Sequence, residues 1–273
     1  MSGTLYVVAT PIGNLEDISA RALRILGEVD LIACEDTRHT RKLLDRYGIS
    51  KPLVSYHEHN ESARAAELMI DLLAGKNIAL VSDAGTPLIA DPGYRLVEQA
   101  RQRGVTVSPV PGPSALLAAL SASGLPTDSF VFLGFLPPKQ GQRRKLLEEW
   151  KSLPATLVFY EAPHRILETL EDIAAIFGPR HCVLARELTK IHEEFLRGTP
   201  SQLREALAER AAVKGEITAM IAKSAEVESD ETPLDEAVQK LIQAGVPRME
   251  ALKTVARRRG LSKREVYKIV NER

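Results

Sequence analysis

Three carboxylates in the first third of the chain lie where a ligand could bind. Asp83 and Asp91 belong to a stretch rich in glycine and proline, residues 81–93, which follows the apolar run Ile78–Val81, and Asp36 follows an earlier apolar run. Parallel sheets bind their ligands beyond the carboxyl ends of the strands. Acidic side chains there favour a neutral or cationic ligand. A simpler interpretation of any one stretch is that glycine and proline mark a surface turn.

The usual phosphate-binding motifs are missing from these loops. A P-loop places a lysine and a serine or threonine after its glycines, and no lysine follows in residues 81–93. The dinucleotide fingerprint needs three glycines after the first strand, but residues 10–14 (TPIGN) hold one. S-adenosylmethionine fits better, because it combines an apolar adenine, a ribose diol, a zwitterionic tail and a sulfonium cation.

The first half of the chain alternates strand and helix patterns, which would bring these loops to one edge. Apolar runs predict strands at Leu5–Ala9, Leu31–Cys34, Leu53–Tyr56, Ile78–Val81 and Val105–Val110. Amphipathic stretches predict helices at Ser19–Leu26, Arg38–Tyr47, Ser62–Ala74 and Tyr94–Arg103. Asn60 is expected to cap the third helix. The alternation predicts an α/β domain with a largely parallel sheet over residues 1–113.

The second half of the chain also contains predicted strands and helices, but they follow one another in a different order. Strands are predicted at Phe130–Leu133, Thr156–Tyr160, Cys182–Leu184, Glu194–Arg197 and Ile217–Ala222. Helices are predicted at Ala115–Ser123, Arg143–Trp150, Arg165–Phe177 and Gln202–Ala212. The last strands follow one another with few helices between them, which favours antiparallel pairing. We therefore expect a second α/β domain over residues 114–224, with a cleft between the two domains.

Residues 225–273 are expected to form a linker and a basic tail of three helices. Thr232 and Pro233 are expected at the N-cap and first position of the first helix. Ser262 and Glu265 are expected to form a capping box for the last. The last 26 residues hold nine lysines and arginines against three glutamates, although the whole chain balances 36 basic and 36 acidic residues. Contact with nucleic acid and a solvated helical face explain this charge about equally well.

Composition and spacing exclude several protein classes. The two cysteines, Cys34 and Cys182, lie far apart in apolar runs and are expected to be buried free thiols, as in a reducing compartment. No cysteine or histidine spacing suggests a metal site. No apolar run approaches the length of a membrane span, and the N-terminus lacks a signal-peptide pattern. These features predict a soluble cytoplasmic protein without a membrane partner.

Four segments carry a family resemblance: residues 7–23, 85–89, 110–115, and the pair 159–161 with 215–218. Together they resemble the tetrapyrrole methylase superfamily, the class III methyltransferases, over about residues 3–224. The resemblance implies two α/β domains of the tetrapyrrole methylase fold, S-adenosylmethionine in the interdomain cleft, and a homodimer.

Narrower strings lie at residues 10–17, 34–38, 82–87 and 160–165. They resemble the superfamily members that methylate ribosomal RNA, which implies 2′-O-methylation of a cytidine ribose in 16S rRNA near the decoding site, within the small ribosomal subunit. Tetrapyrrole-modifying members carry G-x-G-P-G-D in the first loop and G-D-P in the second. This chain has ATPIGN at residues 9–14 and GTP at residues 85–87, which disfavours a porphyrinoid substrate.

The resemblance also implies a cofactor site of small and apolar residues. Its expected members are Pro11, Gly85, Thr86, Ile89, Ser114, Ala115, Tyr160 and Ala219. Asp83 is a further cofactor-binding candidate, since it could supply the carboxylate that tetrapyrrole-modifying members have at the position of Thr86. Ser114 and Ala115 also fit a plain helix start.

A ribose hydroxyl is a poor nucleophile, so a group that accepts its proton should help. The catalytic candidates are Asp36, Arg38, Asp83 and Glu161, with Glu35 and His164 as further possible bases. The sequence does not choose among them. Arg38, His39 and Arg165 could hold phosphates. Asp36 and Arg38 also fit a helix cap and an ordinary surface charge.

Two alternatives to an RNA methyltransferase remain open at this stage. One is a small-molecule methylase of the same superfamily, and the other is an RNA-binding assembly factor without catalysis. The basic run 139–145 could contact an RNA backbone or simply begin a solvated helix. Few aromatic residues are available for stacking, which favours recognition of RNA by its shape.

Overall fold

The computed structural model describes residues 2–224, 233–258 and 261–271. Its first sheet contains only parallel strands, in the order β3-β2-β4-β1-β5. Their bounds are β1 Thr4–Val8, β2 Leu31–Cys34, β3 Leu53–Ser55, β4 Ile78–Val81 and β5 Thr106–Val110. The largely parallel sheet predicted for this half is confirmed, and no strand bound differs from its prediction by more than one residue.

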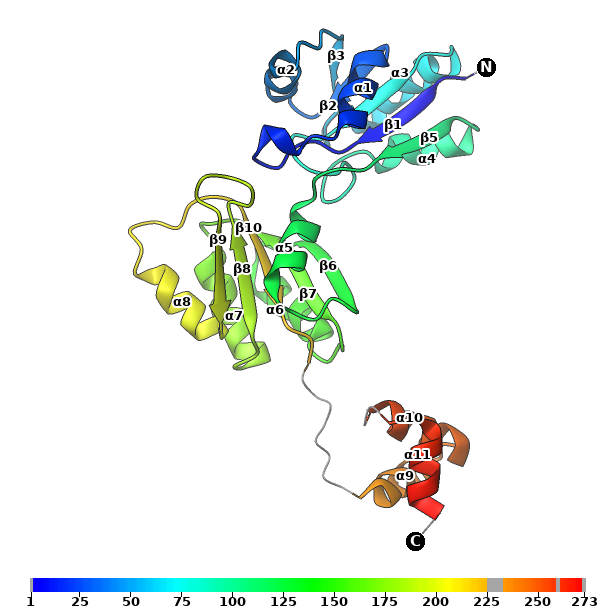
Figure 1. The fold of residues 1–273 in the computed structure, drawn as a ribbon, viewed down its shortest axis with the longest axis vertical. Coiled ribbons are helices and arrows are strands. Elements are labelled where there is room, and N and C mark those ends of the chain that lie inside the picture. Colours follow the sequence, from blue (N-terminus) through cyan, green and yellow to red (C-terminus); the bar gives the residue numbers. More distant parts are fainter. Residues whose placement is uncertain (1, 225–232, 259–260, 272–273) are drawn as a thin grey trace.

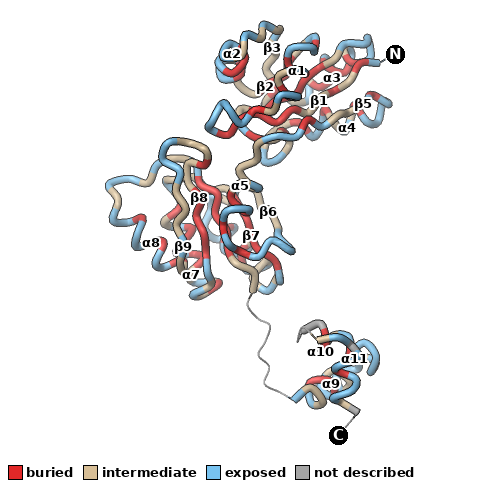
Figure 2. The backbone as a smooth tube through the Cα atoms, viewed as in Figure 1, coloured by how far each residue is buried: buried red, intermediate tan, exposed pale blue. Residues whose placement is uncertain are grey.

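Helices cover both faces of this sheet (Figure 1). They are α1 Ala20–Glu28, α2 Thr37–Arg46, α3 Glu61–Leu73 and α4 Tyr94–Gln102, preceded by the short 3-10 helix η1 Leu15–Asp17. One buried cluster joins α1 and α2 to the sheet, and a second joins α3 and α4 to it. Strand β4, buried over its full length, contributes Ala79 and Val81 to the first cluster and Ile78 and Leu80 to the second. Figure 2 shows buried and exposed residues along the chain of this domain. The continuous apolar run of β4 follows from burial on both faces.

The second sheet is mixed and has the order β6-β7-β10-β8-β9. Its strands are β6 Phe130–Phe135, β7 Thr156–Glu161, β8 Cys182–Arg186, β9 Glu194–Gly198 and β10 Ile217–Ile221. Strands β6 and β7 are parallel, whereas β10 runs antiparallel to both β7 and β8, and β9 antiparallel to β8. The antiparallel pairing expected for the last strands is confirmed.

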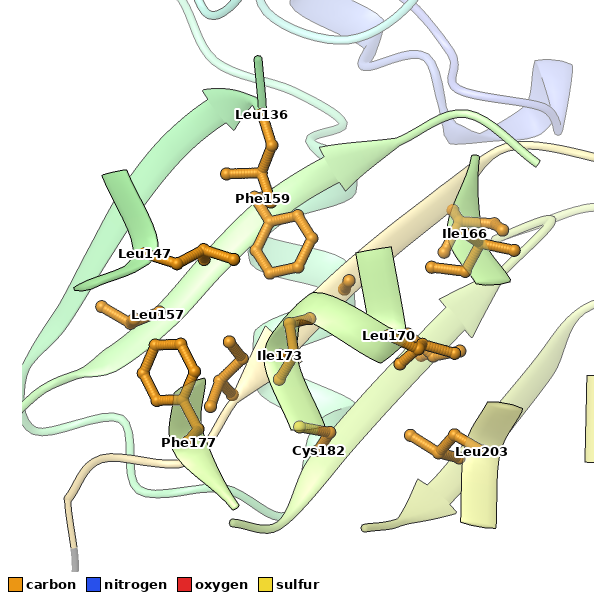
Figure 3. Packing of buried hydrophobic residues seen from close by; sticks show 14 of the residues in the cluster. Leu136, Leu147, Leu157, Phe159, Ile166, Leu170, Ile173, Phe177, Cys182 and Leu203 are labelled. Atoms are coloured by element: carbon orange, nitrogen blue, oxygen red, sulfur yellow. The ribbon is translucent and has the colours of Figure 1, made fainter. Parts of the chain in front are cut away.

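The helices of the second half also lie on both faces of their sheet. Helix α5, Ala115–Ser123, covers one face, and α6 Gln140–Trp150, α7 Ile166–Phe177 and α8 Pro200–Ala208 cover the other. Figure 3 shows the larger core, in which Phe159 of β7 packs among side chains of α6 and α7. The tetrapyrrole methylase fold class expected from the sequence is confirmed, including the helical C-terminal tail.

Several predicted helix starts were wrong, for identifiable reasons. Helix α8 begins at Pro200 because Thr199 and Gln202 form a capping box, a T-P-S-Q signal that the prediction missed. Helix α6 begins at Gln140 rather than at Arg143. The prediction missed its first turn because the residues there are polar and carry no apolar pattern. Asn60 is the N-cap of α3 without a capping bond, since its amide oxygen accepts from the backbone N–H of His57 instead.

The tail consists of α9 Leu234–Gln243, α10 Arg248–Arg258 and α11 Lys263–Asn271, packed around a small apolar cluster. The capping box is confirmed by reciprocal bonds of 2.6 and 3.2 Å between Ser262 and Glu265. Pro233 is the N-cap of α9 rather than its first residue, and the predicted cap Thr232 lies outside the described residues. Within residues 2–224, 233–258 and 261–271, every helix falls short of the length or the apolar character that a membrane span requires.

Candidate functional site

A pocket of about 390 Å³ lies between the two sheets, and both halves of the chain line it. The first half contributes Ile12 and the loop after β4, through residues 83–86 and 89–91. The second half contributes the start of α5, the ends of β6 and β7, and residues next to β8 and β10. These residues are Ser114, Ala115, Phe135, 160–163, Ala185, Leu188 and 216–218. Ligand sites commonly occupy such a position between two layers.

The loop after β4 is held against the loop after β1 by backbone pairing. Thr10 and Gly85 form an isolated bridge with N–O distances of 2.8 and 3.0 Å, and the Thr10 hydroxyl donates to the carbonyl of Ser82. Gly85 has φ of +79°, and a Cβ there would lie 3.5 Å from Cγ2 of Ile12. Glycine is favoured at this bridge because other residues rarely adopt a positive φ.

A contact between the two halves closes the pocket near Leu188. The backbone N–H of Asn14 donates to the Thr189 hydroxyl at 3.1 Å. A Cβ on Gly13 would lie 2.5 Å from Cγ of Lys190, so the first loop packs tightly against residues 188–190. This packing fixes the two walls of the pocket relative to each other.

The predicted catalytic pair Asp36 and Arg38 forms a helix cap. Asp36 accepts from the backbone N–H of Arg38 at 2.8 Å, and its other carboxylate oxygen pairs with the Arg38 guanidinium at 2.7 Å. The hydrogen bonds from Arg38 hold the pKa of Asp36 well below its usual range. Neither residue lines the pocket, and the Arg38 side chain is 88% exposed. The cap reaches the pocket only through Asp83, which accepts from the backbone N–H of Asp36 at 3.0 Å.

Asp91 lines the same wall in a different environment. Burial and the nearby carboxylates of Glu35 and Asp83 raise its pKa to about 6, although the Ser82 hydroxyl opposes the rise. Burial, followed by the charge of Asp83, also raises the pKa of Glu35. This wall therefore gathers carboxylates that destabilise one another's charged forms.

The opposite wall holds Glu161, and its carboxylate is fully occupied. One oxygen accepts from Arg165 Nε and the Ala162 N–H, each at 2.8 Å, and from a second Arg165 nitrogen, while the other accepts from Thr169 at 2.7 Å. The Glu161 side chain is fully buried. Arg165 also donates to the carbonyl of Leu136. Arg165 is consequently tied to this network, and the predicted phosphate-binding role does not match its position.

Two aromatic rings form the mouth of the second wall. Strand β6 shifts register between Phe132 and Phe135, where Gly134 has φ of +64°. This bulge turns Phe135 toward the pocket, where it remains 58% exposed and packs edge-on against Tyr160 at 5.6 Å between ring centroids. Burial raises the pKa of Tyr160, whose hydroxyl accepts a hydrogen bond from the backbone N–H of Leu116.

Most predicted site residues meet in the pocket, and a few do not. The lining contains the predicted residues Asp83, Gly85, Thr86, Ile89, Ser114, Ala115, Tyr160 and Glu161. Ser114 also caps α5, so its two interpretations coexist. Two predicted residues, Pro11 and Ala219, do not line the pocket. Pro11 is buried beside the lining. Ala219 faces the helix-covered core, because side chains alternate along β10 and its neighbour Thr218 faces the pocket.

Sequence reasoning missed other residues of the site. Asp91 was recognised as a loop carboxylate but not as a site residue, and Phe135 gave no signal because the bulge that exposes it depends on strand pairing. The basic run 139–145 lies at the start of α6, one of its two predicted interpretations. Arg143 is buried against Asp172 at 2.7 Å, and Arg144 pairs with the same carboxylate at 2.6 Å, so both hold α6 against α7.

Comparisons with known proteins agree with this architecture. The family model for Tetrapyrrole (Corrin/Porphyrin) Methylases matches residues 4–204. A protein named Ribosomal RNA small subunit methyltransferase I from Halalkalibacterium halodurans is 51% identical over 99% of this chain and 95% of its own length. The protein of the same name from Escherichia coli O157:H7 is 48% identical, with the same two coverages, 99% and 95%.

Solved structures share the fold at much lower sequence identity. A diphthine synthase superposes with a TM-score of 0.63 at 17% identity, covering 81% of this chain and 90% of its own. Uroporphyrin-III C-methyl transferase from Thermus thermophilus, complexed with S-adenyl homocysteine, gives 0.57 at 19% identity, covering 80% of this chain and 97% of its own. At these identities the likeness concerns the fold alone.

Proposed function

The chain belongs to the family of tetrapyrrole (corrin/porphyrin) methylases, and from this premise we propose that it methylates the 2′-hydroxyl of a cytidine in 16S ribosomal RNA with S-adenosylmethionine. One observation carries the proposal. Among the described residues, the pocket lining holds the four carboxylates Asp83, Asp91, Glu161 and Glu216 but no lysine, arginine or histidine. Glu161 and Glu216 are paired with Arg165 and Lys190. Asp83 and Asp91 therefore leave the negative charge that suits a sulfonium cation and not a nucleotide phosphate.

The shape of the first wall fits this cofactor. The open cradle at Gly85 lets a ligand approach the backbone, and Thr86, Ser114 and Ala115 add small side chains around it. Ile89, 41% exposed on the same loop, offers an apolar surface for an adenine ring. When bound, S-adenosylmethionine supplies a methyl group already activated by its sulfonium, so the protein contributes orientation and electrostatics.

An RNA substrate is favoured by the mouth of the pocket. Phe135 presents an exposed aromatic face beside Tyr160, and a nucleobase can stack on such a face. Two near-full-length relatives carry ribosomal RNA methyltransferase names, which supports the same substrate class. The exposed guanidinium of Arg38 lies in the first turn of α2, whose cap Asp36 donates its backbone N–H to Asp83, and it could contact the RNA backbone there.

The test incubates the protein with S-adenosylmethionine labelled in its methyl group. Small ribosomal subunits and free 16S rRNA, both from a strain that lacks the gene, and a uroporphyrinogen are supplied separately. We expect label in the RNA, and mapping by nuclease-resistant dinucleotides should place it on one cytidine ribose. Label in the tetrapyrrole alone would indicate a small-molecule methylase. Binding of RNA without any label would indicate an assembly factor.

A further inference from the structure

The four carboxylates of the pocket differ in what they bind. Asp83 accepts from the backbone N–H of Asp36, Glu161 is saturated by its own network, and Glu216 pairs with Lys190 at 3.0 Å. In the part of the chain that the structure describes, Asp91 is paired with no arginine, lysine or histidine. The neighbouring Ser82 hydroxyl, which donates to the carbonyl of Ala84 at 3.2 Å, acts to lower the pKa of Asp91.

We propose that Asp91 accepts the proton of the ribose 2′-hydroxyl during methyl transfer, while Glu161 only positions the opposite wall. This inference rests on the proposed function. A carboxylate that accepts a proton needs a free oxygen facing the substrate and no cation that would hold it charged. Among the described lining residues, Asp83 also lacks a cation partner, but its carboxylate accepts the backbone N–H of Asp36, which favours the charged form. Asp91 lines the pocket with neither a cation nor a backbone N–H of the described residues on its carboxylate.

The backbone fixes the loop that carries Asp91. Leu88 and Ala90 adopt φ of +72° and +65°, a conformation that L residues avoid. At Gly93, a Cβ would lie 2.9 Å from Leu80 and Leu88, and the backbone N–H donates to Glu61 of α3 at 3.1 Å. The loop is therefore pinned at both ends around Asp91, which keeps the carboxylate on the pocket wall at an energetic cost.

The surroundings of Asp91 set its proton affinity. The charged and titratable groups near it are Glu35 at the end of β2, Asp83 after β4 and Tyr160 of β7 across the pocket, and the Ser82 hydroxyl is a further polar neighbour. Burial and the two carboxylates raise the pKa of Asp91 to about 6. At pH 7 to 8 the group is ionised and can accept a proton, and its basicity exceeds that of an ordinary aspartate.

The step balances without a further reactant. The hydroxyl oxygen forms a bond to the methyl carbon as the carbon–sulfur bond breaks, and the electron pair of that bond stays on sulfur as a neutral thioether. The oxygen–hydrogen bond breaks at the same time, and its proton passes to the Asp91 carboxylate. Solvent then removes the proton, which restores the base for the next turnover.

The test compares Asp91→Asn with Glu35→Gln and the native chain on small ribosomal subunits. We expect Asp91→Asn to lower kcat about 10²- to 10⁴-fold, the usual contribution of a general base, with little change in Tm. Cofactor affinity, measured by calorimetry without RNA, should change less than about threefold. Glu35→Gln should stay active, because it removes a neighbouring charge and not the base.

The pH dependence of kcat adds a measurement that would not change if Asp91 had only a structural role. For the native chain, kcat should rise with pH through about 6 as Asp91 loses its proton. Glu35→Gln should shift this limb to lower pH, because one of the carboxylates that raise the pKa of Asp91 is gone. In the protein without RNA, carbon-13 NMR of the aspartate carboxyls should show a titration near 6 that is absent from Asp91→Asn.

The outcomes separate this inference from the proposed function. If the native chain methylates RNA and Asp91→Asn keeps more than half of its kcat, Asp91 is not the base. Loss of cofactor binding together with activity would also overturn the inference, since Asp91 would then hold the cofactor. If the native chain labels no RNA, the proposed function itself fails, and the NMR titration would then test only the environment of Asp91.

Discussion

Both walls of the pocket carry a carboxylate near the end of a strand, one in the loop after β4 and one as the last residue of β7, but their environments differ. Asp91, on the first wall, lies among the carboxylates of Asp83 and Glu35. Glu161, at the end of β7 on the second wall, is enclosed by Arg165 and Thr169. The comparison teaches that a position beyond a strand does not define a catalytic role. The groups around the carboxylate decide it.

Sheet topology explains the difference between the walls. The first sheet is entirely parallel, so the carboxyl ends of all its strands meet at one edge, and the acidic loops that follow them crowd together. The second sheet is mixed, so neighbouring strands present opposite ends at the pocket. In one row of the sheet, Glu161 of β7 pairs with Ile217 of β10, which pairs with Arg186 of β8. Each wall contributes two carboxylates to the lining, but Glu161 and Glu216 of the second wall are paired with Arg165 and Lys190.

The largest effect that would sharpen this comparison is the loss of stability in Glu161→Ala. Removing the carboxylate leaves Arg165 and the Thr169 hydroxyl buried without their partner, so the free energy of unfolding should fall by about 3–5 kcal/mol. Denaturant unfolding followed by circular dichroism measures it.

The matched control for this change is Glu168→Ala on α7, the helix that carries Thr169. The Glu168 side chain is 72% exposed, so its removal should alter the unfolding free energy by less than about 0.5 kcal/mol. A Glu161→Ala protein that is as stable as the native chain but inactive would break the comparison, because Glu161 would then take part in the chemistry.

An intermediate effect concerns the aromatic mouth of the second wall. Phe135→Ala should weaken RNA binding by about 1–3 kcal/mol, the usual worth of stacking one base, which raises KM about 5- to 150-fold. The cofactor affinity should not change, and Phe135→Tyr should keep the native KM. Steady-state kinetics on small subunits measures both variants. A lower affinity for the cofactor in Phe135→Ala would move this ring from the RNA side to the cofactor side.

The smallest expected effect comes from alanine substitutions at two glycines that have the same φ angle. Gly85 and Gly124 both have φ of +79°, and nothing lies within 4 Å of a Cβ at Gly124. Alanine at either position should cost about 1–2 kcal/mol of unfolding free energy, the cost of a left-handed residue. Calorimetry should show weaker cofactor binding only for Gly85→Ala. Equal cofactor affinity in both variants would show that the first wall does not hold the cofactor through this loop.

Much of the fold could be predicted from the sequence because its signals are local. The apolar runs Leu31–Cys34 and Ile78–Val81 coincide with β2 and β4 as observed, and the Ser262 capping box forms as expected. Predicted helix bounds were wrong where the first turn consists of polar residues, as at the starts of α6 and α8. Such helix ends depend on caps and tertiary packing more than on apolar periodicity.

For the candidate site, the loops could be predicted but the partners of each side chain could not. Residues 83–89 and 114–115 were identified as strand-end loops, and the structure brings them into one pocket. Arg165 and Arg143 looked available for phosphate in the sequence, yet both are tied to carboxylates in the structure. Ala219 was predicted to line the pocket, but its neighbour Thr218 lines it instead. Successive residues of a strand face opposite sides of the sheet, so an error of one residue reverses the face.

The sequence by itself determined the strand and helix pattern, the family resemblance and the presence of acidic loops without phosphate-binding lysines. Periodicity and short motifs carry that information within a few consecutive residues. Only the tertiary structure decided which carboxylates are paired with cations and which aromatic ring faces the pocket mouth. The environments of Asp91, Glu161 and Phe135 depend on contacts between distant segments, and burial and charge act through those contacts.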